Sequence, residues 1–241
     1  MESFGNGRAT LDGAAAHHLG RVLRAEPGQS YELSDGQSVW LGRVERVGRE
    51  AIEFALLEPV AARESRIVAT LLLAIVKFER FEWAIEKATE LGAEAIVPLA
   101  AERSERALVG AAAKRAERWQ RILLESAQQA RCLRPPALRP VVSPAEGFRA
   151  ADASVKVMLS ERSDAPVLRS VLEEKVARQN VSGRDRVQFA LAVGPEGGWT
   201  EAEFAAAAAA GFREASLGAN ILRTETAVAA GLAAVHLYFD D

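Results

Sequence analysis

From residue 66 onward, short continuous apolar runs alternate with segments in which apolar residues recur every three or four positions. The continuous runs predict buried strands at 67–76, 95–99, 155–159 and 187–193. The periodic segments between these strands predict helices that cover the sheet. Such alternation is typical of an α/β domain built on a mostly parallel sheet.

The sequence indicates which face of each predicted helix is buried and where some of the helices begin or end. One helix before Gly92 places four apolar residues on one face: Phe81, Ile85, Ala88 and Leu91. A long helix over 111–132 turns Trp119, Ile122, Leu123 and Ala130 inward. Its opposite face carries an exposed stripe of Lys114, Arg118, Arg121, Glu125 and Gln128. A further helix is expected near 166–178, and the last helix begins around Thr224 and carries Val228, Leu232 and Val235. Thr200 and Glu203 form a predicted capping box for an alanine-rich helix that ends at Gly211.

The first 60 residues follow a different pattern. Short runs at 30–33, 39–44 and 51–57 are separated by turn signals such as Asp35-Gly36, which predicts a small β-rich unit. One or two helical turns are expected over 17–24, and residues 58–65 are predicted to form a linker. We therefore predict two domains, at 1–62 and 66–241.

Composition limits the classes of protein to which the chain can belong. It has 241 residues, of which 49% are hydrophobic and 26% charged, and no apolar run has the length of a bilayer-spanning helix. The first twenty residues lack the core of a signal peptide. The single cysteine, Cys132, excludes an internal disulfide, and the three histidines are not spaced as metal ligands. We expect a cytoplasmic protein that uses no metal and no membrane.

Charge is segregated along the chain, although the net charge is only −3. Residues 101–140 hold nine Lys or Arg against four Glu, whereas residues 190–241 hold two Arg against seven acids. A local basic face is what contact with nucleic acid phosphates requires. The long helix over 111–132 is therefore a candidate RNA-binding surface, and a solvated charged face is the alternative interpretation.

Two glycine-containing segments carry the chemical signal. Gly194-Pro-Glu-Gly-Gly198 follows the strand at 187–193, and Leu217-Gly218 leads to Leu222-Arg-Thr-Glu-Thr226 before the last helix. Glycine allows the main chain to approach a ligand closely, and ligands of open α/β sheets bind at the carboxyl ends of strands. The first loop lacks the spacing of a dinucleotide-binding or P-loop motif, and alone it would read as a structural turn. Together with residues 159–162 after a third strand, it predicts three loops that converge on one crevice.

These two segments resemble the cofactor loops of the RsmE family, the bacterial 16S rRNA uracil-N3 methyltransferases of the SPOUT superfamily, which use S-adenosylmethionine. The resemblance extends to 17–24, 77–92 and 98–104, so it covers nearly the whole chain. It implies a SPOUT methyltransferase domain with a carboxyl-terminal trefoil knot, preceded by a PUA-like RNA-binding domain. It also implies a homodimer whose substrate is 16S rRNA or the 30S subunit.

The resemblance also implies which residues bind the cofactor, mainly through their backbone. These residues are Leu159, Leu191, Ala192, Val193, Gly194, Pro195, Glu196, Gly197, Gly198, Leu217, Gly218, Ile221, Leu222, Arg223 and Thr226. Methylation of uracil N3 requires loss of the N3 proton, which a base or a cation beside the carbonyl oxygens would assist. Arg223 is our first candidate for this role, followed by Glu225 and Glu196. Glu225 has the alternative role of a first-turn carboxylate on the helix dipole, and Glu196 that of a local amide cap.

Candidate RNA-binding residues lie in both domains: Arg21 and Arg24 in the first, and Lys114, Arg118, Arg121 and Arg131 in the second. Two other functions remain open on the sequence. One is ribose 2′-O-methylation of rRNA or tRNA, as in other SPOUT families. The other is a ribosome-assembly factor that binds RNA without transferring methyl groups.

Overall fold

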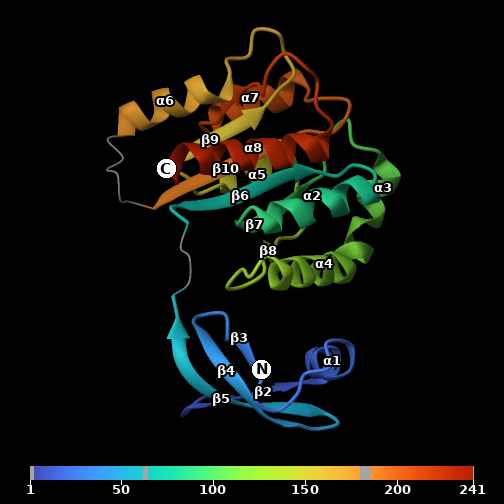
Figure 1. The fold of residues 1–241 in the computed structure, drawn as a ribbon. Helices are drawn as coiled ribbons and strands as arrows, with labels where there is room; N and C mark the ends of the chain where they lie inside the picture. Colours follow the sequence, from blue (N-terminus) through green and yellow to red (C-terminus); the bar gives the residue numbers. More distant parts are fainter. Residues whose placement is uncertain (1–2, 62–64, 180–185, 241) are drawn as a thin grey trace. The chain divides into compact units, whose positions relative to one another are not determined.

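A parallel sheet of six strands organises residues 65–241 in the computed structural model, which describes residues 3–61, 65–179 and 186–240 (Figure 1). The strands are β6 (Ile67–Ala74), β7 (Ala93–Leu99), β8 (Ala137–Leu138), β9 (Val155–Leu159), β10 (Val187–Val193) and β11 (Arg213–Ala215). Their order in space is β11-β9-β10-β6-β7-β8, and every neighbouring pair is parallel. The carboxyl ends of all these strands therefore meet at one edge of the sheet.

Helices cover both faces of this sheet because successive strand residues point to opposite sides. Ile67, Ala69, Leu71 and Leu73 of β6 join one buried cluster, whereas Leu72 joins another. The first cluster packs against α2 (Phe78–Glu90), α4 (Ala116–Gln129), α6 (Leu168–Gln179) and α8 (Thr224–Phe239). The second packs against α5 (Pro144–Ala150) and α7 (Glu201–Ala209). In Figure 1, α8 lies beside α2, and the two helices pack together.

Most elements of this unit follow the hydrophobic pattern. The strands predicted at 155–159 and 187–193 are confirmed residue for residue, and that at 67–76 ends at Ala74. The capping box of Thr200 and Glu203 is confirmed at the start of α7. β8, α5 and β11 were not anticipated, because two- and three-residue strands and a seven-residue helix are too short to show a period.

The long helix predicted over 111–132 is confirmed over 116–129, but its bounds are wrong. The chain instead forms α3 (Arg106–Ala112), a 3-10 turn (Ala113–Arg115) and α4, which ends at Gln129. Apolar spacing reports which residues are buried, but it does not register a change from i+4 to i+3 hydrogen bonding. As a result Lys114 lies on the 3-10 turn, and Arg131 lies beyond the helix with a φ of 55°.

The unit formed by residues 1–64 contains an antiparallel sheet of order β1-β2-β5-β4-β3. Its strands are β1 (Ser3–Gly5), β2 (Arg8–Asp12), β3 (Ser30–Ser34), β4 (Val39–Val47) and β5 (Ala51–Val60). Leu33, Val44, Ile52 and Phe54 are buried in its core, which is packed by α1 (Gly13–His17) and a π-helical turn (His18–Val22). The linker predicted at 58–65 begins too early, because cross-strand pairing with β4 carries β5 to Val60. The rest of that prediction includes residues 62–64, which lie outside the described residues, and the trefoil knot stays a prediction.

Candidate active site

A cavity of about 770 Å³ opens at the carboxyl edge of the parallel sheet. Its walls are the loops that follow β9, β10 and β11, together with the first turn of α8. Eleven of the residues predicted to bind a cofactor line it: Leu159, Val193, Gly194, Pro195, Glu196, Gly198, Leu217, Gly218, Ile221, Leu222 and Arg223. The three predicted loops therefore converge, as expected from strand direction.

Four predicted cofactor residues lie outside the lining. Leu191 and Ala192 are fully buried within β10 and support the cavity from behind. Gly197 lies between two lining residues, and Thr226 is exposed on α8. Glu225, predicted as a catalytic residue, is also outside the lining and points its carboxylate toward α2. Roles for these residues in binding or catalysis stay predictions.

The loop after β10 is held by a tight turn and by an indole ring. The Gly198 N–H donates to the Pro195 carbonyl at 2.9 Å, and Gly198 has a φ of 70°, which L side chains rarely adopt. The buried Trp199 donates its indole N–H to the Leu159 carbonyl at 3.1 Å, which joins this loop to the end of β9. Two of the cavity walls are thus fixed to one another.

The loop after β11 is tied to both of the other walls. Ser216 donates its N–H to the Pro166 carbonyl and accepts from the Leu168 N–H, which fixes it to the loop that follows β9. Thr224, at the start of α8, donates its hydroxyl to the Gly194 carbonyl at 3.0 Å. The cavity is consequently built into the hydrogen-bonded framework of the sheet edge.

Arg103 is a lining residue that the sequence reasoning missed. It comes from the loop after β7, and its Nη1 donates to the Gly197 carbonyl at 2.7 Å. Its aliphatic carbons lie over the α-carbon of Gly197. The signal was available, because Arg103 follows a predicted strand and lies in the 98–104 segment that carries part of the family resemblance.

Most charges around the cavity are compensated. Arg162 pairs with Glu201 at 3.1 Å and stacks on the ring of Phe204. Glu196 accepts from Arg80 at 2.8 Å. In the described part of the chain, no hydrogen bond or ion pair is formed by the side chains of Arg223 or Glu161, both of which line the cavity. One free guanidinium and one free carboxylate therefore face the same space.

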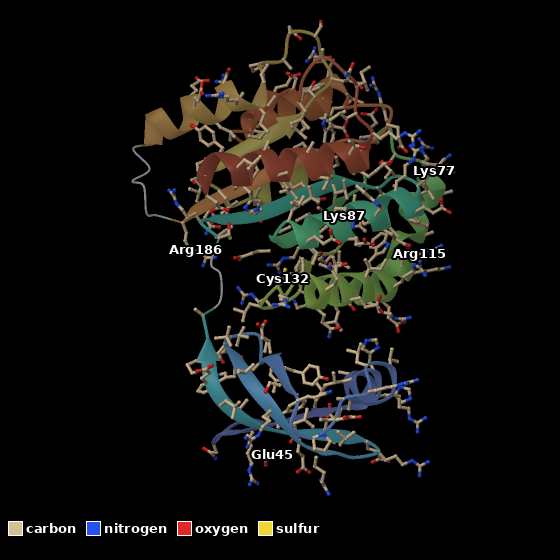
Figure 2. All side chains as sticks on the ribbon, viewed as in Figure 1. Glu45, Lys77, Lys87, Arg115, Cys132 and Arg186 are labelled. Atoms are coloured by element: carbon tan, nitrogen blue, oxygen red, sulfur yellow. The ribbon has the colours of Figure 1, made fainter. Side chains whose placement is uncertain are left out.

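The predicted RNA-binding residues are dispersed and differ in availability. Arg118 donates to Glu82 at 2.9 Å, and this partner raises the pKa of Arg118. Lys114 and Arg121 are exposed, whereas Arg131 adopts a positive φ and has an interaction partner. In the small unit, Arg21 and Arg24 are both exposed. Figure 2 shows Lys77 and Arg115 at the same end of the large unit, where Arg115 stacks on Phe78 and lies 3.7 Å from Glu82.

The described residues also bear on metal binding and on membrane insertion. They contain no group of three or more His, Cys, Asp or Glu side chains arranged to hold a metal ion. Their helices also include none with the length and apolar character needed to cross a membrane.

Comparison with protein families matches nearly the whole chain. Residues 63–236 match the RNA methyltransferase domain, and residues 11–57 match the RNA methyltransferase PUA domain. Ribosomal RNA small subunit methyltransferase E of Synechocystis is 36% identical over 94% of this chain and 72% of its own length. The protein of the same name from Mycobacterium bovis is 32% identical over 94% of this chain and 85% of its own length.

Solved structures agree with these matches. A ribosomal RNA small subunit methyltransferase E from Neisseria gonorrhoeae, bound to S-adenosylmethionine, superposes with a TM-score of 0.84 at 30% identity. The alignment covers 99% of this chain and 95% of that one. A putative methyltransferase from Legionella pneumophila, also in complex with S-adenosylmethionine, gives a TM-score of 0.81 at 28% identity and covers 98% and 94% of the two chains.

Proposed function

Because this chain belongs to the RsmE family of RNA methyltransferases, we propose that it methylates N3 of a uridine in 16S rRNA, at the decoding region of the small ribosomal subunit, with S-adenosylmethionine as the methyl donor. The observation that supports this most is the convergence of three strand-end loops on one cavity that holds eleven of the residues expected to bind the donor. Relatives from two bacteria carry the name of a small-subunit rRNA methyltransferase.

The residues at the cavity fit the donor. A volume of about 770 Å³ lies within the range of small-molecule sites, which is roughly 300–1,000 Å³. Leu159, Leu217 and Leu222 supply apolar surface for a purine ring, and the backbone of the glycine loop supplies polar groups. The free carboxylate of Glu161 suits the positive charges of the donor, which leaves the free guanidinium of Arg223 for the substrate base. When bound, S-adenosylmethionine supplies an electrophilic methyl group on a cationic sulfur.

We assign the polarisation of uracil to Arg223. Its side chain lies at the amino end of α8, lines the cavity, and has no partner among the described residues. A guanidinium beside a uracil carbonyl oxygen would stabilise the anion formed when N3 loses its proton to solvent, and this anion is the nucleophile that N3 methylation requires. The positive end of the α8 dipole acts in the same direction. Glu196 and Glu225 both contact Arg80.

RNA binding is assigned to exposed cations in both units: Arg21, Arg24, Lys114, Arg118, Arg121 and Arg131. We further propose that the protein is a cytoplasmic homodimer. Leu237 on α8 is 72% exposed and Trp83 on α2 is 43% exposed, and these two helices pack together. Apolar side chains of this size on adjacent helices suit the buried centre of a symmetric interface.

Two measurements test the proposal. Calorimetry with S-adenosylmethionine should show micromolar or tighter binding, and absence of binding at millimolar ligand would favour a non-catalytic RNA-binding assembly factor. Nucleoside mass analysis of 16S rRNA incubated with protein and donor should show a methyl group on the uracil base. A methyl group on the ribose would replace the proposed reaction with 2′-O-methylation.

A further inference from the structure

We propose that Arg80, a residue outside the cavity lining, is a positioning residue that sets the cofactor loop after β10 against the start of α8. The inference rests on the proposed function, since its readout is binding of the methyl donor. Arg80 lies in the first turn of α2. Its Nη1 is 2.8 Å from Glu196 Oε1, and its Nε is 4.0 Å from Glu225 Oε1. One guanidinium on α2 therefore joins the loop after β10 and the start of α8, each of which lies more than a hundred residues from Arg80 in sequence.

The geometry gives the two carboxylates different environments. The Glu225 side chain is 14% exposed, and its Oε2 is buried without a hydrogen-bond partner among the described residues. The Glu196 side chain is 41% exposed and sits on the loop that walls the cavity. A carboxylate that is largely buried is strongly attracted to a neighbouring cation, so Glu225 holds Arg80 in place. Arg80 in turn holds Glu196. Because the Glu196 side chain is the more exposed of the two carboxylates, its contact with Arg80 is the one that solvent weakens.

This arrangement controls the distance between two functional walls. The loop at 194–198 has one tie to α8, the hydrogen bond from Thr224 to Gly194, and one tie to the loop after β7, the hydrogen bond from Arg103 to Gly197. Glu196 lies between these two ties, and its contact with Arg80 links that midpoint to α2. α2 itself packs on α4 and α8, so it is a rigid support. Arg223 and the cofactor loop are thereby kept in a fixed relation.

Arg80 is not well suited to the alternative role of an RNA phosphate contact. Its side chain is only 31% exposed, and its single positive charge faces two carboxylates. The charge of Arg80 is therefore already compensated, which leaves it little attraction for a phosphate group. Arg223, by contrast, has no carboxylate partner among the described residues and faces the cavity.

Donor affinity and kinetics of three variants test the assignment: Arg80→Gln, Arg80→Lys and Glu196→Gln. Arg80→Gln should raise the Kd and KM for S-adenosylmethionine about tenfold, because a charge-assisted hydrogen bond no longer fixes the loop, with the KM for RNA unchanged. Glu196→Gln weakens the same contact, because a neutral amide oxygen still accepts from Arg80 but without the ion-pair attraction, and it does not leave Glu225 as an uncompensated buried charge. It should therefore lower donor affinity in the same direction even if Arg80→Gln folds poorly. Arg80→Lys should recover much of the affinity, because an ammonium group can still pair with Glu196.

The matched control is Arg213→Gln, which removes an ion pair of similar length with Glu174 at the opposite edge of the sheet. It should leave donor affinity unchanged. Donor affinity equal to wild type in Glu196→Gln would overturn the proposal, as would a rise in the KM for RNA alone in Arg80→Gln. Failure of the wild-type protein itself to bind the donor would instead overturn the proposed function. The double variant Arg80→Gln/Glu196→Gln should lose no more affinity than Arg80→Gln alone, because Arg80→Gln already removes the contact that Glu196→Gln weakens.

Discussion

The two edges of the parallel sheet are built from the same strands but differ in the surroundings of some of their charged side chains. At the carboxyl edge, the loops leave a cavity into which Arg223 and Glu161 point without partners among the described residues. At the amino edge, charged side chains and strand ends are held by ion pairs and hydrogen bonds, as two examples show. Glu94 pairs with Arg186 at 2.9 Å, and Asp240 accepts from the Arg66 N–H at 3.1 Å. Figure 2 shows Lys77, which follows β6, and Arg186, which precedes β10, at opposite ends of the large unit.

This difference separates residues that act on a ligand from residues that hold the fold. A charge that already has a partner gives little free energy to a new ligand, since the old contact must first break. An unpaired charge in a cavity can contact a ligand of opposite charge without first breaking another contact. Availability of a charge, rather than its presence, is therefore the better guide to function in this protein.

The largest expected effect comes from two glycines that have similar backbone demands at opposite edges. Gly218 at the cavity has a φ of 124°, and Gly211 after α7 has a φ of 85°, with open space around both α-carbons. Gly218→Val should abolish detectable binding of S-adenosylmethionine, because relief of the strained φ moves the loop that walls the cavity. Gly211→Val should bind the donor normally and lose about 1–2 kcal/mol of stability. Calorimetry and thermal unfolding measure the two quantities, and normal donor affinity in Gly218→Val would contradict the site.

Removal of the free guanidinium at the carboxyl edge should act on the chemical step. Arg223→Ala is expected to lower kcat roughly 100-fold, with a change of less than about threefold in donor Kd, because its charge is needed when the uracil anion forms. The kcat of Arg223→Lys should lie between those of the wild type and Arg223→Ala, since an ammonium keeps the charge but not the planar geometry. Single-turnover kinetics measure this, and an unchanged rate in Arg223→Ala would move the role to another group.

The exposed stripe of Lys114, Arg118 and Arg121 allows cations with and without a carboxylate partner to be compared in RNA binding. Lys114→Gln plus Arg121→Gln should weaken RNA binding and reduce the salt dependence of its affinity by about 1.4–1.8 log units per log unit of salt. Arg118→Gln should reduce that slope by less, because Arg118 is already paired with Glu82. Titration of RNA binding at several salt concentrations gives the slopes. Equal slopes in all variants would remove this stripe from the RNA-binding surface.

The amino edge should respond in stability alone. Glu94→Gln removes the contacts with Arg186 and Arg134 and is expected to lower the free energy of unfolding by about 0.2–1 kcal/mol, the range of exposed ion pairs. Donor affinity and kcat should stay at wild-type values. Denaturant unfolding together with calorimetry checks both. A loss of activity without a loss of stability would break the division between the two edges.

The smallest effect concerns pH at the amino edge. Partial burial raises the pKa of Asp240, but hydrogen bonds from His236, the Arg66 N–H and Ser65 outweigh it and hold that pKa below its ordinary value. A lowered folded-state pKa gives stability that is present above the unfolded pKa and is lost as pH falls through the folded one. Asp240→Asn should therefore lower stability at neutral pH and flatten the acid side of the stability curve. An unchanged acid side would show that these bonds contribute nothing.

Prediction from the sequence succeeded where a residue's environment is set by its neighbours in the chain. The β9 and β10 strands and the Thr200 capping box are local patterns, and each is confirmed. The loops after these strands converge because parallel strands end at one edge, a rule that needs no side-chain detail. The same reasoning failed at 111–132, where the hydrogen-bond pattern changes within a single apolar period.

Pairing between distant residues was beyond the reach of the sequence. Arg118 and Arg121 look alike in the stripe, yet only packing of α2 against α4 places Glu82 beside Arg118. Glu225 and Arg223 flank the same helix start, but one points toward Arg80 and the other lines the cavity. Arg223 is the extended residue that precedes α8 and Glu225 lies in the first turn of that helix, and what lies beside each side chain is decided by the fold.

The sequence alone determined the two-part organisation of the chain, its layered α/β unit and the loops from which a ligand site is made, because those features follow from short-range patterns of apolar residues and glycine. Only the tertiary structure decided which charges remain free, since a side chain's partner depends on segments brought together from distant parts of the chain. Arg80 is the clearest case: its sequence neighbours gave no reason to single it out, and its significance comes from Glu196 and Glu225, more than a hundred residues away.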